Sequence, residues 1–95
     1  REEIPEALTV TDLRRPVEAI EGLRIVLRRV VEAEGEGLRL KEYLVSAEGE
    51  EELRVTEKQF LLPRLSKAPL AVALSDHVIG KDPVRLFIVE RRVER

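Results

Sequence analysis

The chain contains no cysteine, a single histidine and only three aromatic side chains among its 95 residues. Without cysteine, disulfides, thiolate chemistry and iron–sulfur ligation are excluded. Carboxylates would have to supply most ligands of any metal, and such oxygen sites suit Ca²⁺ or Mg²⁺. The acidic stretch Glu48–Glu52 lacks aspartate and the spacing of a calcium loop. We therefore predict no metal site and no cofactor.

The only cluster that suggests catalysis is Ser75-Asp76-His77. On a helix, consecutive residues point about 100° apart, so these three side chains cannot converge as nucleophile, base and orienting acid. A carbohydrate cleft is also unexpected, because it would need more aromatic side chains to line it. We predict no catalytic residue and a protein that is not an enzyme.

Methionine, tryptophan and asparagine are absent as well, while 38% of the residues are charged. Few thermolabile residues and many ion-pairing residues are typical of proteins from hot environments, so we predict a thermophilic source. The net charge is −2. Residues 61–95 hold seven basic and four acidic side chains, a local charge of +3. That excess is smaller than dedicated duplex-binding proteins usually show.

Length and hydropathy predict one domain over residues 1–95. The longest apolar run, Ala68 to Leu74, is too short to cross a bilayer, so no membrane partner is expected. The first residues, Arg-Glu-Glu-Ile-Pro, do not resemble a signal peptide. We expect a cytoplasmic protein.

Three consecutive strands are predicted, over Leu23–Ala33, Leu38–Ala47 and Glu52–Phe60. Apolar and polar residues alternate along them, and short glycine-bearing connectors separate them, a pattern typical of an antiparallel meander. A rival interpretation makes residues 17–33 one helix, because several apolar residues there also fall near helical spacing.

The period changes after this meander. Leu70, Leu74 and Val78 recur at helical spacing, with Ser66 as a cap and Gly80 as a stop, which predicts a main helix over residues 66–79. A last strand is predicted over Val84–Val93. A short N-terminal helix could follow Pro16 and end at Gly22. The predicted fold class is α+β: an antiparallel sheet of about four strands packed by one main helix.

The last predicted strand offers the candidate interaction surface. Arg85, Phe87 and Arg91 share one face by strand alternation, and Arg92 follows them. An aromatic ring between arginines can hold single-stranded nucleic acid by stacking and phosphate contact. The same pattern is also how an edge strand protects itself with charge.

We predict a non-enzymatic interaction module that self-associates or docks into a larger protein assembly. The first alternative is a nucleic-acid-associated protein that uses the basic C-terminal strand. The second is a small-ligand sensor. It follows from Arg28–Gly35, Glu42-Tyr-Leu44 and Pro69–Leu74, which resemble the ligand-sensing domain of bacterial transcription regulators related to chorismate lyase. That resemblance implies a small-molecule pocket.

Overall fold

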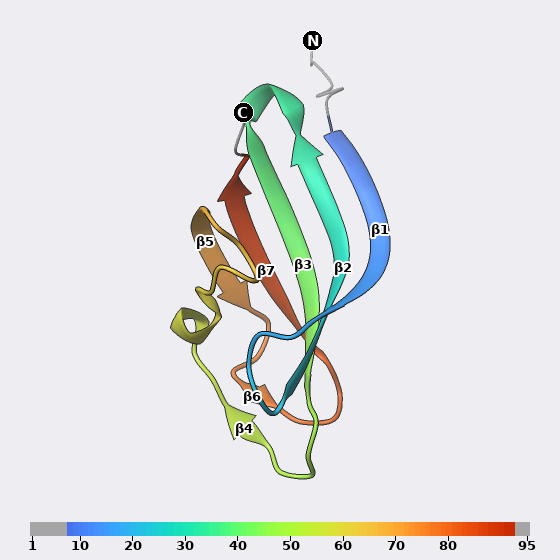
Figure 1. Ribbon diagram of the computed structural model, residues 1–95, viewed down its shortest axis with the longest axis vertical. Helices are drawn as coiled ribbons and strands as arrows, with labels where there is room; N and C mark the ends of the chain where they lie inside the picture. The colour runs from blue at the N-terminus through green and yellow to red at the C-terminus, as the bar shows by residue number, and fades with distance from the viewer. Residues whose placement is uncertain (1–7, 93–95) are drawn as a thin grey trace.

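Residues 8–92 are described by the computed structural model, in which five antiparallel strands form the main sheet. The strand order is β1-β2-β3-β7-β5, so β1 and β5 are the two edges (Figure 1). The strands are β1 (Leu8–Val17), β2 (Leu23–Ala33), β3 (Leu38–Ala47), β5 (Pro69–Leu74) and β7 (Val84–Arg91).

A smaller layer packs against one face of this sheet. It contains β4 (Leu53–Arg54) paired with β6 (Val78–Ile79), and the 3₁₀ turn η2 (Glu57–Phe60). A second 3₁₀ turn, η1 (Glu34–Glu36), connects β2 to β3. The small layer contributes Val55, Phe60, Leu65 and Ile79 to the core.

The core forms where the inward residues of the central strands meet that layer. Leu23, Ile25 and Leu27 of β2 are buried at alternate positions, as a half-covered strand requires. Across the sheet they are joined by Tyr43, Val45, Ala47, Leu86 and Ile88. Burying each large apolar side chain stabilises the fold by about 1.5–3 kcal/mol.

The predicted β2–β3 hairpin is confirmed, with both strands at the expected bounds. Residues 17–33 are therefore not one helix. The connector turns tightly because Gly37 adopts a left-handed conformation with φ of 68°, which glycine reaches without steric cost. The last strand is also confirmed as far as Arg91, whereas Val93 lies outside the described residues.

The predicted α+β class is wrong, because residues 8–92 contain no α-helix. The segment assigned to a main helix forms β5 and β6 instead. Residues 69–74 satisfy a period of two as well as a helical period. Pairing with β7 decides between them by joining β5 to the existing sheet. Leu70, predicted to face the core, is consequently exposed.

Two other predictions are wrong at the ends of the meander. Only Leu53–Arg54 of the third predicted strand is a strand, and it pairs with β6 rather than with β3. The short N-terminal helix is absent, since β1 runs through Pro16 to Val17. Proline is tolerated there because β1 is an edge strand, whose outward amides need no partner in the sheet.

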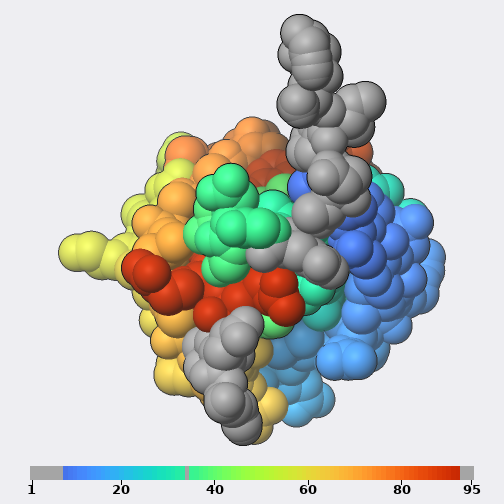
Figure 2. Space-filling model, turned by 90° about the horizontal axis from the view of Figure 1, so that it is seen from above, coloured from blue at the N-terminus to red at the C-terminus, as the bar shows by residue number. Residues whose placement is uncertain are grey.

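At one end of the sheet, which we call the hairpin end, no other described strand or 3₁₀ turn lies over β1 and β2 (Figure 1). The hairpin end comprises Leu8–Asp12 of β1, Arg28–Ala33 of β2 and Leu38–Leu40 of β3, which are neighbours in register. In Figure 1 no other described ribbon overlaps the upper halves of β1 and β2. Seen from above in Figure 2, the β2–β3 turn lies at the surface beside the end of β7.

Candidate protein-interaction site

The hairpin end exposes apolar side chains that the core does not use. Leu8 and Val10 are 55% and 58% exposed, and both lie on the edge strand β1. From Arg28 to Ala33 every residue of β2 is half-buried, so the alternation of buried and exposed positions stops there. The described residues fully cover neither face of the sheet at this end, which favours contact with a partner.

β1 adds a second feature that favours docking. It is ten residues long and borders the main sheet, with β2 as its single neighbour among the described residues. Its outer backbone donors and acceptors can pair with an added strand. Long edge strands with exposed apolar residues are usually protected or used for association.

A row of alternating charges crosses the outer face of the sheet next to the hairpin end. Arg29 Nε lies 2.8 Å from Asp12 Oδ1, and Arg29 Nη1 lies 3.4 Å from Glu42 Oε1. Arg85 Nε is 3.6 Å from the other oxygen of Glu42. The hydrogen bond from Arg29 holds the pKa of Asp12 below its usual value. The row joins β1, β2, β3 and β7, and Arg28 Nη1 lies 3.7 Å from Asp12 Oδ1 beside it.

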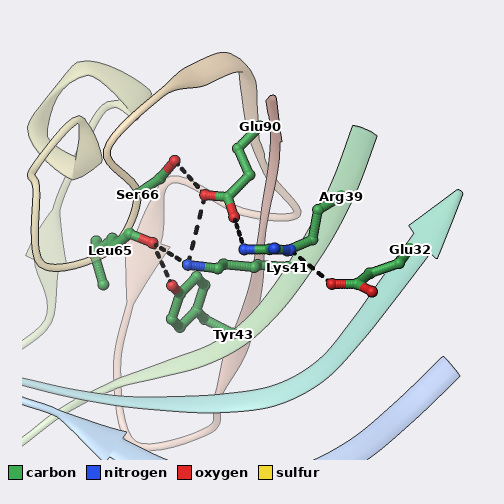
Figure 3. Close-up of polar contacts among 7 residues, drawn as sticks. All are labelled: Glu32, Arg39, Lys41, Tyr43, Leu65, Ser66 and Glu90. Carbon is green, nitrogen blue, oxygen red and sulfur yellow. Dashed lines mark hydrogen bonds and ion pairs between the residues drawn. The ribbon is translucent and has the colours of Figure 1, made fainter. Parts of the chain in front are cut away.

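The inner face carries a buried polar cluster centred on Glu90 (Figure 3). Ser66 Oγ donates a hydrogen bond of 2.6 Å to Glu90 Oε1, and Arg39 Nη1 donates one of 2.9 Å to Oε2. Lys41 Nζ lies 3.5 Å from Oε1. On its other side, Arg39 Nε donates to Glu32 Oε2 at 3.0 Å. Glu90 is thereby almost enclosed by donors, which compensates for its burial.

The same cluster attaches the segment before β5 to the sheet. The carbonyl oxygen of Leu65 accepts hydrogen bonds from Tyr43 Oη at 2.6 Å and from Lys41 Nζ at 3.1 Å. Burial, together with the negative charge of Glu90, raises the pKa of Tyr43 to about 12. Tyr43 therefore remains a neutral donor at physiological pH.

His77, the only imidazole, lies in the loop before β6 and not at the end of a helix. Its Nε2 is 2.8 Å from Glu57 Oε2, and this hydrogen bond lowers the pKa of Glu57. Among the described residues, no nucleophilic side chain forms a hydrogen bond with His77. No group of three or more metal-ligating side chains occurs between residues 8 and 92.

The four residues of the predicted interaction surface lie along β7 and directly after it. Arg85 is exposed and paired with Glu42, and Phe87 on the same face is half-buried. Arg91 is exposed at the end of β7, and the amide of Arg92 donates 2.8 Å to the carbonyl oxygen of Gly37. Their role in binding stays a prediction.

The sequence interpretation misses Leu8 and Val10, because it predicts no strand before Leu23. The alternation Leu8-Thr9-Val10-Thr11 is the signal that could identify them. It also misses the Glu90 cluster, whose members come from positions far apart in the chain and leave no local motif.

Within residues 8–92 no helix has the length and apolar character needed to span a bilayer. The thermophilic source, self-association and cytoplasmic location stay predictions.

No curated protein and no solved structure matches the chain. A family model does match, over residues 1–90, and it describes the TraK C-terminal domain. This family indicates a protein-interaction module related to conjugation, which agrees with the incompletely covered sheet end. Because the match covers nearly the whole chain, the chain belongs to the TraK C-terminal domain family.

Proposed function

We propose that this chain is a protein-interaction module of a conjugation-related assembly and that it docks its partner on the hairpin end. The observation that carries the proposal is the sheet between Arg28 and Ala33, which the described residues cover only in part, next to the exposed Leu8 and Val10. A partner that covered these side chains would remove apolar surface from water, which is the main source of association free energy.

The edge of β1 supplies the second part of the interface. An extended partner segment would add a strand beside β1 through main-chain hydrogen bonds. Its side chains would then alternate between the two faces, both of which are incompletely covered at the hairpin end. The partner is either another protein of the assembly or a second copy of this chain.

Site-specific photo-cross-linking in the host tests this proposal. A photoreactive amino acid replaces Val10 or Leu40 at the hairpin end, and Leu61 serves as the matched control, since it is also exposed but lies after η2. We expect cross-links to defined proteins from Val10 and Leu40 and few from Leu61. Light scattering of the purified chain then separates a second copy from a different protein.

The charge variant Val10→Lys gives an independent check. It places an ammonium group on the docking surface and should abolish the cross-links from Leu40 without lowering the melting temperature, because Val10 is exposed. Equal cross-linking from Leu61 and from the hairpin end would contradict the proposal.

A further inference from the structure

A hollow of about 310 Å³ opens on the inner face of the sheet, between the end of β7 and the segment that leads into β5. Five of the residues lining it are basic, and one is acidic. They are Arg39, Lys41, Arg64, Lys67, Arg91 and Glu90. This is a local concentration of positive charge in a chain whose net charge is −2.

The inner wall of the hollow is rigid. Both oxygens of Glu90 are engaged by Ser66, Arg39 and Lys41, and its side chain is 5% exposed (Figure 3). Lys41 is held further by the carbonyl oxygen of Leu65. The two inner cations are therefore already in position before any ligand enters, which reduces the entropy that binding costs.

The outer wall carries two exposed cations, Arg64 and Lys67. Neither forms an ion pair within the described part of the chain. Cations that line a concave, low-dielectric wall attract an anion more strongly than isolated surface charges do. A guanidinium group such as that of Arg64 can also bind a carboxylate through two parallel hydrogen bonds.

Several features favour a protein carboxylate over nucleic acid as that anion. The hollow is small, with room for one or two acidic side chains rather than for a row of phosphates. Phe87, the aromatic residue of β7, lies on the opposite face from Glu90 and offers no stacking surface inside the hollow. The charge row on the outer face pairs its arginines with Asp12 and Glu42, so the row offers no run of free cations to a polyanion.

The second sheet edge brings such a carboxylate to the hollow. β5 begins at Pro69, directly after lining residues Lys67 and Ala68, and its only neighbour in the described sheet is β7. An extended segment that lies along β5 can therefore place an acidic side chain beside Arg64 and Lys67. We propose that the hollow binds a carboxylate from an acidic segment of a protein partner. This proposal rests on the proposed function in one respect, because both assume that the bound partner is a protein.

Fluorescence anisotropy with a labelled tetraglutamate peptide tests the proposal on the full chain. We expect a dissociation constant below about 1 mM at low salt. The double variant Arg64→Gln/Lys67→Gln should weaken binding by roughly five- to tenfold, since it removes two exposed cations. The control Arg54→Gln/Lys58→Gln removes two exposed cations outside the hollow and should change binding by less than about twofold.

Three further binding measurements distinguish a protein carboxylate from inorganic phosphate and from nucleic acid. A tetraglutamine peptide and inorganic phosphate should not compete at equal concentration, and a short DNA duplex should bind no better to the wild type than to the Arg64/Lys67 variant. No binding of tetraglutamate, equal loss in the two double variants, or tighter binding of duplex through Arg64 and Lys67 would each overturn the proposal. Cross-linking from Val10 should persist in the Arg64/Lys67 variant, so failure at the hollow is distinguishable from failure at the hairpin end.

Discussion

Replacing Glu90 with glutamine is expected to destabilise the domain more than the same replacement at any exposed glutamate. The glutamine side chain fits the same space but carries no charge, and its amide nitrogen cannot accept a hydrogen bond. The amide nitrogen would therefore face either Arg39, which contacts Oε2, or both Ser66 and Lys41, which contact Oε1, and these donors would lose their acceptor.

The magnitude follows from how completely each partner is buried. Removing one member of a fully buried ion pair costs about 3–5 kcal/mol. Here Arg39 keeps Glu32 at 3.0 Å and Lys41 keeps the carbonyl oxygen of Leu65 at 3.1 Å, so part of the loss is compensated. We expect a decrease of about 2–3 kcal/mol in the free energy of unfolding. For a chain of this size that corresponds to roughly 10–20 °C in melting temperature.

Urea denaturation followed by far-ultraviolet circular dichroism measures this change. Glu32→Gln is the matched control, because Glu32 contacts the same arginine but is more exposed, and it should cost less than about 1 kcal/mol. A double-mutant cycle of Glu90→Gln with Arg39→Met should show a coupling of about 1–2 kcal/mol. A loss below about 0.5 kcal/mol in Glu90→Gln would refute the role assigned to this cluster.

Three other outcomes are expected. Because the pKa of Tyr43 is raised from 10.0 to about 12, the unfolded chain loses this proton first. The free energy of unfolding should therefore fall by about 2–3 kcal/mol between these pH values, and Tyr43→Phe should remove this decrease. A titration of tyrosinate absorbance in the folded protein with a midpoint near pH 10 would contradict the prediction. Gly37→Ala should lower the free energy of unfolding by about 1–2 kcal/mol in chemical denaturation, since φ of Gly37 is 68°. Gly35→Ala is the control and should be nearly neutral, so equal effects of the two variants would contradict the turn geometry. Since His77 lowers the pKa of Glu57, the stabilisation that His77→Ala removes should be present above pH 4.5 and vanish as the pH falls further. A difference in melting temperature between the wild type and His77→Ala that stays constant across acid pH would contradict this prediction.

The sequence was sufficient to predict β2, β3 and the start of β7, because each combines a period of two with β-branched residues and a glycine turn nearby. The sequence does not predict β5, since Pro69–Leu74 fits both the strand period of two and the helical period. Only its pairing with β7 makes this segment a strand. β1 was missed because Arg14-Arg15-Pro16 interrupts its alternation, next to an irregularity in register between Asp12 and Arg15.

The candidate site was less predictable than the strands. Glu90 and Arg39 are 51 positions apart, and Ser66 reaches Glu90 across 24. No local pattern marks residues whose contact depends on the completed sheet. The hairpin end is equally hard to recognise, because the extent of β2 that the small layer covers is set by the completed fold and not by a local motif in Arg28–Ala33.

Amide hydrogen exchange of the protein alone and within its native assembly tests the central claim most directly. If partners dock at the hairpin end, the amides of Leu8–Asp12 and Val30–Ala33 should exchange at least about tenfold more slowly in the assembly, while those of Leu53–Arg54 remain unchanged. Unaltered exchange along β1, with new protection elsewhere on the surface, would contradict the account.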